Sequence, residues 1–487
     1  MNSMLRKSIY SALAILIHFS LTSQQPCLTH FNCFTVIAGR NATSDGSVLF
    51  AHNEDDYGTR IVNWYRVERK IYSAGENLII NDSGAIISQA DETNAYLWLD
   101  MPEMEFSDSY MNEYGVVIAS DQCDSREDDP EITEGGIGYW LRRIIAERAR
   151  SAKEGVKIGG ELITRFGYTY SGRSYFIADP NEAWIMNVVQ GKHWVAQRVP
   201  DDRVAVVPNY YTISQVNLSD TANFLGSSDL IGYATAKGWY DPGKDGEFSF
   251  REAYSAPDKL IHKSNISRRW KGINALSMYE YKREDEFPFA FLPRQKVSLK
   301  DLMNLLRDHY EGTPLDLTNG YKSGNPHFTE NDPICSPTTQ YGFVAQLRNY
   351  LPADLGVVLW IAPYRPCIHP FIPWYCGVEE IPQAYQKYPV AEALDHHFKP
   401  PEGLYTVDET LAYWYFHSHA DGIDKEFGEL SGKSRRDSEA FENKYIRKQA
   451  VFEKDVLFND KNDPDAIRRE VTGFTLQAST EALKLFK

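Results

Sequence analysis

The chain has 487 residues, a formal net charge of -16 and 43% hydrophobic residues. The excess of acidic residues argues against nucleic acid or an anionic membrane surface as a partner, because both select a basic face. The hydrophobic fraction is that of a globular protein with a large core.

The first residues have the pattern of a secretory signal peptide. Arg6 and Lys7 precede a largely apolar run from Ile9 to Leu21, which is followed by small polar residues. The run is shorter than the roughly 20 apolar residues that a membrane-spanning helix needs. We therefore expect residues 1–23 to be a signal peptide and the mature chain to be exported, to the periplasm or the cell exterior. No later segment is apolar enough to suggest a membrane span.

The next segment has the pattern of a β-hairpin. Apolar runs at 34–38 and 48–51 flank a turn that contains Asn, Ser, Asp and Gly. Further strands are expected at residues 115–120, 174–178, 182–189, 193–199, 204–207 and 356–361. Strands therefore dominate this part of the chain.

Three helices are expected before residue 400. Helical periodicity extends from 138 to 150, with apolar residues on one side and most Arg and Glu residues on the other, and again from 152 to 166. A third helix should begin at Ser298, where Asp301 completes a capping-box pattern, and extend to about Tyr310.

From residue 408 onward the chain is predicted to be mainly helical, and its charged segment 426–454 is typical of a solvated helix face. Strands, then two helices, paired strands and more helices favour an α+β layered sandwich over a doubly wound sheet. No linker rich in Pro, Gly or Ser divides the first four hundred residues, so we expect one large core there.

The 6 cysteines form no CxxC pair, which argues against zinc ribbons and thioredoxin-like redox motifs. The histidine pairs at 396–397 and 417–419 lack Cys or Glu at metal-binding spacing, so we expect no metal site and no cofactor. Cys367 and Cys376 flank a loop that contains Pro and Trp. The sequence leaves open whether they form a disulfide in an oxidising compartment or remain two free buried thiols.

Several segments, in a fixed order, carry a family resemblance. They read NCFTVIAGRNATSDGSVLFAHNEDD, GGIGYWLRRIIAERARSA, SYFIADPNEAWIMNVVQGKHWVAQRVPDDRVAVVPNYYTI, SRRWKGINAL, PTTQYGFVAQLRNYLP and AYWYFHSHADG. In these segments the chain resembles the cysteine-nucleophile dipeptidases of the dipeptidase A and dipeptidase D type. Those enzymes are N-terminal nucleophile hydrolases, related to secernins and more distantly to penicillin V acylase and choloylglycine hydrolase. The resemblance implies a four-layer αββα sandwich over residues 33–400, with a mainly helical region at 401–487 packed on it.

The resemblance makes Cys33 the catalytic nucleophile. In this class the nucleophile is the first residue of the mature chain, and its free α-amine is the general base. An amine pKa of about 7.7 to 8.0 and a thiol pKa of about 8.5 let a proton pass between the two groups at neutral pH. Residues 24–32 would then form a propeptide, which the resemblance implies is removed when Cys33 attacks the carbonyl of Asn32.

By the same resemblance, Asp55 holds the α-amine and the thiol in position. His52 is a departure, because relatives commonly have an Arg three residues before that Asp, whereas a His supplies only a pH-dependent charge. The usual lowering of the thiol pKa by an Arg would then pass to Arg268 in the segment SRRWKG, with Arg269 as the alternative counterpart.

Asn209 matches the Asn that, in the relatives, donates its side-chain amide to the tetrahedral oxyanion. Each such donor contributes roughly 3 to 4 kcal/mol to transition-state stabilisation. Gln122 is the candidate for a second donor, because it lies beside Asp121, where the acylases have an Asn.

The expected function is hydrolysis of dipeptides or short peptides through a thioester on Cys33. A first alternative is an acylase or amidase that acts on a non-peptide amide, such as an N-acyl amino acid, a bile-acid conjugate or a penicillin. A second is a non-catalytic, secernin-like binding protein, and His52 is the feature in its favour. The sequence leaves the oligomeric state open, and a homo-oligomer is compatible with it.

Overall fold

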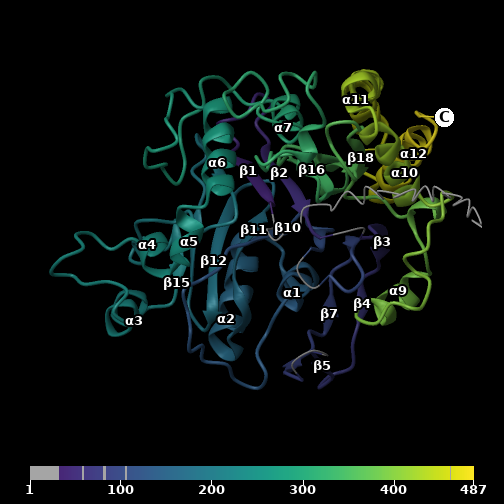
Figure 1. The fold of residues 1–487 in the computed structure, drawn as a ribbon. Coiled ribbons are helices and arrows are strands. Elements are labelled where there is room, and N and C mark those ends of the chain that lie inside the picture. Colours follow the sequence, from purple (N-terminus) through teal and green to yellow (C-terminus); the bar gives the residue numbers. More distant parts are fainter. Residues whose placement is uncertain (1–31, 58–59, 81–83, 105–106, 461, 487) are drawn as a thin grey trace, which may run out of the picture. The chain divides into compact units, whose positions relative to one another are not determined.

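Two antiparallel β-sheets form the centre of the structure, a computed structural model (Figure 1). It describes residues 32–487 except for 58–59, 81–83, 105–106, 461 and 487. The expected signal peptide, residues 1–23, and residues 24–31 of the expected propeptide lie outside the described residues. Among the helices that are described, none is long and apolar enough to cross a membrane.

The first sheet contains the predicted hairpin and has six strands within the described residues. In spatial order they are β14 (Val204–Val207), β1 (Phe34–Ala38), β2 (Val48–Asp55), β16 (Thr339–Leu347), β17 (Val357–Pro363) and β18 (Ile372–Tyr375). Every neighbouring pair is antiparallel. β1 is therefore an interior strand, with the next strand of the chain on one side and a strand from the middle of the chain on the other.

The second sheet has eight strands in the part of the chain that the structure describes. In spatial order they are β15 (Phe224–Gly226), β13 (Trp194–Arg198), β12 (Ala183–Gly191), β11 (Tyr168–Ala178), β10 (Val117–Gln122), β9 (Ser109–Asn112), β8 (Tyr96–Asp100) and β3 (Asn63–Val67). Between β3 and β8 in the sequence are two small antiparallel pairs, β4 (Lys70–Ile71) with β7 (Glu92–Thr93) and β5 (Asn77–Ile79) with β6 (Ile86–Ser88).

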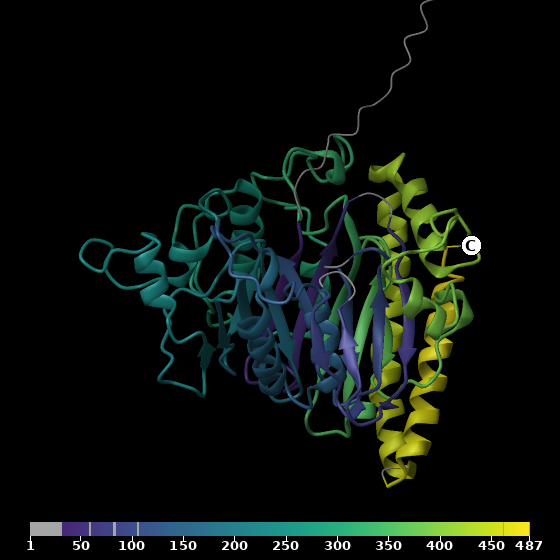
Figure 2. The ribbon, with the colours of Figure 1, turned by 90° about the horizontal axis from the view of Figure 1, so that it is seen from below.

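The two sheets pack face to face. Phe50 of β2 and Phe176 of β11 meet across the interface, with ring centroids 6.0 Å apart. Ile177, the next residue of β11, belongs instead to a second apolar cluster under α1 (Trp140–Arg148) and α2 (Ala152–Phe166). Side chains alternate in this way because successive residues of a strand point to opposite faces of the sheet. Figures 1 and 2 show α1 and α2 on the outer face of the eight-stranded sheet.

Helices also cover the outer face of the six-stranded sheet. α6 (Lys263–Leu276), α7 (Leu299–Leu305), α10 (Ala412–Asp424) and α12 (Pro464–Ala482) contact β14, β16, β17 and β18 in turn. α11 (Phe427–Asp460) lies beside α12 (Figure 2). The remaining described helices are α3 (Leu230–Ala236), α4 (Phe250–Tyr254), α5 (Pro257–Leu260), α8 (Ala353–Gly356), α9 (Val390–His396) and the 3₁₀ turns η1 (Pro326–Phe328) and η2 (Gln383–Tyr385).

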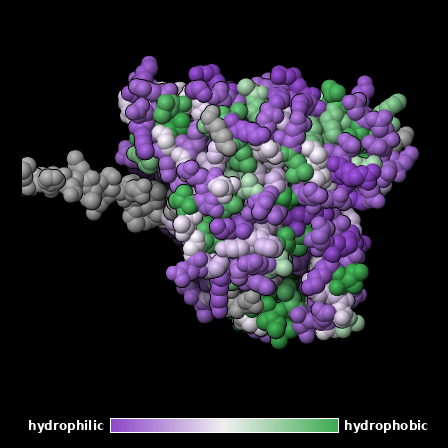
Figure 3. Space-filling model, turned by 90° about the vertical axis from the view of Figure 1, so that its right-hand side faces the viewer, coloured by the Kyte–Doolittle hydropathy of each residue, from purple (hydrophilic) through white to green (hydrophobic). Residues whose placement is uncertain are grey.

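The α+β class, the αββα layer order and the helical C-terminal region are as predicted. Figure 3 views the side of the C-terminal helices, where hydrophilic residues predominate, and this agrees with a solvated face on α11. The domain boundary at residue 400 stays a prediction.

Two expectations were wrong or incomplete. The helix that begins after Ser298 has the expected capping box with Asp301, but it ends at Leu305 because the chain then turns, and Tyr310 has a φ of 68°. The strands β3, β8, β9, β16 and β18 were not identified. These strands, such as β8, are mostly buried along their whole length, so they lack the alternating polarity that marks a half-exposed strand.

A buried ion pair joins α11 to the six-stranded sheet, and breaking it should destabilise the fold. Both guanidinium nitrogens of Arg348, which follows β16, lie 2.6 Å from the carboxylate of Glu453. Glu453→Gln leaves a buried positive charge without its partner, a change that typically costs about 3 to 5 kcal/mol. We expect a clearly lower midpoint of urea unfolding.

The matched control is Glu439→Gln, which breaks a half-exposed ion pair with Arg435 on the same helix. Such pairs contribute about 1 kcal/mol or less. Equal shifts of the unfolding midpoint in the two variants would contradict a stabilising role for the Arg348 pair.

Candidate active site

Cys33 lies directly before β1, at the end of an interior strand. β1 pairs antiparallel with β14 on one side and with β2 on the other. Extending the register with β14 by two residues places Cys33 opposite Asn209, and extending the register with β2 by one residue places it opposite Glu54. The sheet therefore brings one amide and one carboxyl group to the two sides of the thiol.

The Cys33 thiol is buried among acidic groups. Only 1% of the residue is exposed, and its Sγ lies 3.5 Å from Glu54 Oε1 and 3.6 Å from the backbone oxygen of Asp55. Burial raises the pKa of the thiol well above its ordinary value, and the negative charges of Glu54, Asp121 and Asp55 raise it further. While Cys33 is joined to Asn32, the thiol is therefore protonated and needs a base before it can attack a carbonyl group.

His52 connects Glu54 to the second sheet. Its Nε2 is 3.0 Å from Glu54 Oε2, and its Nδ1 is 2.9 Å from Thr35 Oγ1 and 3.4 Å from Asp121 Oδ1 on β10. Burial lowers the pKa of His52 to about 4, although the charge of Asp121 acts in the opposite direction. His52 is therefore neutral at neutral pH, so it does not replace the positive charge of the Arg that relatives have there.

Two buried arginines bring positive charge to the site from the eight-stranded sheet and the helix that covers it. Arg142 of α1 and Arg173 of β11 both donate to Ser120 Oγ, at 2.9 and 2.8 Å. Burial raises the pKa of Glu54 well above its ordinary value, and the charges of Arg173 and Arg142 oppose that shift. Most charged residues of this helix were expected on its solvent side, but Arg142 is fully buried. Its positive charge stabilises the carboxylate form of the buried Glu54.

The Asp55 carboxylate is bound by three hydroxyl groups at the start of β16 and just before it. The carboxylate accepts hydrogen bonds from Thr339 Oγ1 at 2.7 Å, from Thr338 Oγ1 at 3.3 Å and from Ser336 Oγ. Burial raises the pKa of Asp55 to about 7, although the hydroxyl groups lower it. Asp55 therefore contacts the thiol through its backbone oxygen, and its carboxylate holds the segment that leads into β16.

Arg268 of α6 joins Cys33 to Asn209. Its guanidinium group donates to the backbone oxygen of Cys33 at 2.5 Å, to Asn209 Oδ1 at 3.0 Å and to Asn265 Oδ1 at 2.9 Å. Its Nε donates to Ser264 Oγ at 3.2 Å. Because Ser264 and Asn265 precede Arg268 by four and three residues on α6, they lie on the same side of that helix.

Arg269, the alternative to Arg268, points elsewhere. It donates to Tyr210 Oη at 2.7 Å and to the backbone oxygen of Pro288 at 2.9 Å. Of the two arginines in the segment SRRWKG, Arg268 is therefore the one that contacts Cys33.

The side chain of Asn209 contacts the backbone of Gln122, not its side chain. Asn209 Nδ2 donates to the backbone oxygen of Gln122 at 3.0 Å, whereas Gln122 Nε2 donates to Asp124 Oδ1 at 2.8 Å. The Asn209 amide is oriented by this contact and by Arg268. The side chain of Gln122 is bound to Asp124 and does not face Cys33.

Asn32 is also part of the buried site. It is 2% exposed, and its Oδ1 accepts a hydrogen bond from Ser264 Oγ at 3.0 Å. The bond between Asn32 and Cys33 is thus held on both sides, through Ser264 before it and through Arg268 after it.

The structure therefore gathers Cys33, Asp55, Asn209, Arg268 and His52 around one end of β1, with Gln122 at the margin. Five residues of the site were not predicted from the sequence: Glu54, Arg142, Arg173, Ser264 and Asn265. The register of the hairpin would have identified Glu54 as the residue across from Cys33. Spacing on a helix would have identified Ser264 and Asn265 beside Arg268, but no local pattern brings Arg142 or Arg173 to the site.

Comparisons with known proteins agree with the segments noted in the sequence. A family model described as peptidase family C69 matches residues 32–435. A probable dipeptidase from Latilactobacillus sakei is 26% identical over 392 residues, which cover 78% of this chain and 81% of that protein. A probable dipeptidase from Salmonella dublin is 28% identical over 377 residues, covering 74% of this chain and 84% of that one.

Among solved structures, a mutant of the conjugated bile acid hydrolase from Clostridium perfringens is similar to this chain with a TM-score of 0.32 and 11% sequence identity. The alignment covers 68% of this chain and 89% of that one.

Neutral His52 predicts a pH dependence of stability. An unfolded chain binds a proton at His52 below a pKa of about 6.5, whereas the folded chain, with a pKa of about 4, does not. The unfolded state then binds more protons, so His52 destabilises the fold as the pH falls from about 6.5 to about 4. The midpoint of urea unfolding of the normal protein should fall more steeply across this window than that of His52→Gln.

The control is His396→Gln, because about a third of the His396 side chain is exposed. This variant should keep the slope of the normal protein. A His52→Gln variant with the normal slope would mean that His52 is protonated in the folded chain.

Proposed function

The chain belongs to peptidase family C69, and on that premise we propose that it is a cysteine-type dipeptidase, which cleaves dipeptides or short peptides through a thioester on Cys33. The observation that carries this proposal is the setting of Cys33, whose thiol contacts the carboxyl group of Glu54 and whose backbone oxygen accepts from Arg268, which also holds Asn209. The names of the relatives, which describe probable dipeptidases, support the substrate class.

The first step we propose is self-cleavage between Asn32 and Cys33. The α-amine of Cys33 is an amide nitrogen before that cleavage, so another base must accept the thiol proton. Glu54 is suited to this role, because its Oε1 lies 3.5 Å from Sγ and burial raises its pKa well above its ordinary value. Sulfur attacks the Asn32 carbonyl, the C–N bond breaks, and the proton passes to the nitrogen that becomes the α-amine. Water then hydrolyses the thioester.

The mature enzyme uses the freed amine as its general base. The thiol gives its proton to the amine as sulfur attacks the substrate carbonyl, and the amine passes that proton to the leaving nitrogen. The resulting thioester is hydrolysed by water that the same amine activates. In this proposal Asn209 donates an amide N–H to the oxyanion, and the contact of Arg268 with Asn209 Oδ1 supports the orientation of that amide.

Export completes the proposal. The pattern of residues 1–23 supports a signal peptide, and residues 24–32 would be the propeptide that self-cleavage removes. Since the new amine forms only when residue 32 has left, export and activation would be separate events.

The test of this sequence of events is the N-terminus of the purified protein. The normal chain should begin at Cys33, whereas Cys33→Ala should retain residues from about Gln24, as read by intact mass and N-terminal sequencing.

Glu54→Gln should slow self-cleavage by about 100-fold or more, because positioned bases typically contribute 10²- to 10⁴-fold. Glu68→Gln is the control, because the Glu68 side chain is exposed, and this variant should mature normally. A normal chain that keeps its residues before Cys33 would sink the proposed mechanism.

Substrate assays test the dipeptidase activity. The matured enzyme should hydrolyse dipeptides such as Ala-Ala at least tenfold faster than N-acyl glycine, a glycine-conjugated bile acid or penicillin V. Asn209→Ala should lower kcat by roughly 10²- to 10³-fold with little change in KM, because an oxyanion donor acts mainly in the transition state. Preference for an acylated substrate would favour the acylase alternative. A matured chain that is inactive on all of them, with Cys33 unreactive to iodoacetamide, would favour a binding protein.

A further inference from the structure

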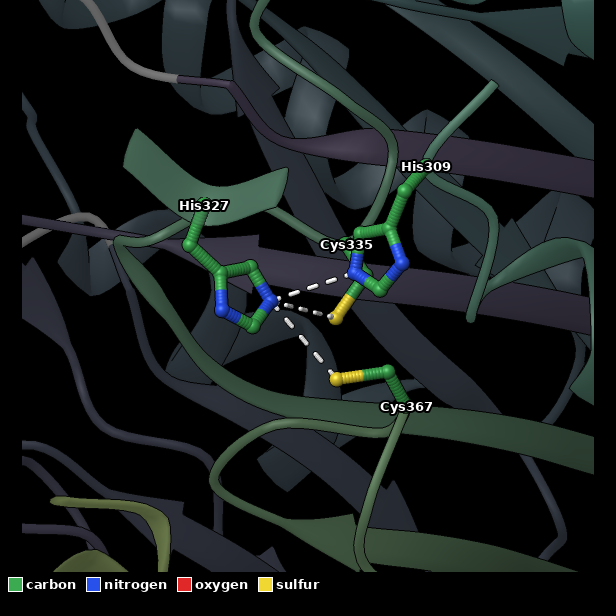
Figure 4. Close-up of side chains that lie close together, drawn as sticks. All are labelled: His309, His327, Cys335 and Cys367. Atoms are coloured by element: carbon green, nitrogen blue, oxygen red, sulfur yellow. Dashed lines mark hydrogen bonds between the residues drawn. The ribbon is translucent and has the colours of Figure 1, made fainter. Parts of the chain in front are cut away.

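Four side chains from two connections of the chain converge near β2: His309, His327, Cys335 and Cys367 (Figure 4). His309 follows α7, His327 lies in η1, Cys335 precedes β16, and Cys367 lies between β17 and β18. His327 is 18 residues from His309, 8 from Cys335 and 40 from Cys367. No compact motif results, which is why the sequence analysis expected no metal site.

The distances between the donor atoms suit one tetrahedral metal ion. All four donor atoms lie within 4.8 Å of one another. His327 Nε2 is 3.1 Å from His309 Nε2, 3.6 Å from Cys367 Sγ and 3.9 Å from Cys335 Sγ. A tetrahedral zinc ion with bonds of about 2.0–2.1 Å to nitrogen and about 2.3 Å to sulfur separates two nitrogens by about 3.3 Å and nitrogen from sulfur by about 3.6 Å.

The second nitrogen of each histidine has a hydrogen-bond partner of the kind that metal-binding histidines use. His309 Nδ1 lies 3.0 Å from Tyr321 Oη and 3.4 Å from Glu311 Oε1. His327 Nδ1 lies 3.4 Å from Asp424 Oδ1 and 3.2 Å from a guanidinium nitrogen of Arg365, which itself pairs with Asp424. With Nε2 on a metal, each Nδ1 keeps its proton and donates it to the neighbouring oxygen.

From this geometry we propose that the four residues bind one structural zinc ion. Two thiolates and two neutral imidazoles form a set of soft and intermediate ligands, which selects zinc over magnesium or calcium. The four residues are buried, and the protein supplies all four ligands, so no position is left for water or substrate. Binding displaces the two thiol protons to solvent and involves no change of oxidation state.

The ion would support the active site without touching it. Cys335 lies between Ile334, whose backbone oxygen accepts from Asn53 Nδ2 at 2.9 Å, and Ser336, whose hydroxyl donates to Asp55. Asn53 and Asp55 are both on β2, next to Glu54. Zinc would thus fix the segment that holds β2 and the Asp55 carboxylate. Loss of the metal should therefore make this part of the active site less rigid.

Metal analysis of the purified protein, in whichever form it is isolated, tests the proposal. After expression with added zinc and purification without chelators or metal columns, the normal protein should carry about one zinc per chain, and the Cys335→Ser and Cys367→Ser variants less than about a tenth of that. Cys376→Ser is the matched control, because Cys376 is also a buried thiol but bonds the backbone oxygen of Asn112 at 3.2 Å, away from the cluster. It should keep its zinc.

Cobalt binding tests the proposal on the normal protein itself, so the result does not depend on whether a variant folds. The normal protein, stripped of zinc and loaded with Co²⁺, should show thiolate-to-cobalt charge transfer and the strong visible bands of a tetrahedral ion. A chelator should lower the Tm of the zinc-loaded normal protein and leave that of Cys335→Ser unchanged.

Two results would overturn the proposal. One is a normal protein without zinc and without cobalt–thiolate bands. The other is an intact mass two hydrogens lower, restored by a reductant and absent in Cys335→Ser, which would assign Cys335 and Cys367 to a disulfide.

Discussion

The structure depends on the balance of charge that is buried between its two sheets. Moving a charged group out of water is costly unless an opposite charge or a set of hydrogen bonds meets it. Here Glu54, Asp55 and Asp121 are buried close together, and burial raises the pKa of each. The counter-charges come from separate elements, Arg142 on α1 and Arg173 on β11, so this balance exists only when the sheets and the helix layer are packed together.

The same contacts that hold the precursor are suited to catalysis. Arg268 binds the backbone of Cys33 and orients Asn209, so one residue of α6 couples the nucleophile to the proposed oxyanion donor. In the proposed sequence of events, Glu54 would be the base while the α-amine is still an amide, and the amine would be the base once it is free. A high thiol pKa before self-cleavage is compatible with this proposal, because the cleavage would itself create the general base.

Support for the site extends beyond it into loops and the C-terminal helices. Asp55 holds the residues before β16, and those residues adjoin the cluster of His309, His327, Cys335 and Cys367. Asp424 of α10 contacts His327, and Glu453 of α11 pairs with Arg348 beside β16. The helical region is thus joined by buried polar contacts to the strands that carry the active site. These contacts hold the side chains of the site on rigid elements, as a preorganised site requires.

Local sequence was sufficient for the hairpin, the paired strands around Asp179, the α+β class and the position of Cys33, because turn residues and side-chain period act over a few residues. It was also sufficient for the identity of the peptidase family. It did not determine that Arg268 and not Arg269 reaches Cys33, that His52 is neutral, or that Arg142 is buried. Each of these depends on which distant elements pack together in the fold, and no local pattern records that. The four-residue cluster is the clearest case, since only the packing of the α7–β16 connection against the β17–β18 loop brings its donor atoms within 4.8 Å of one another.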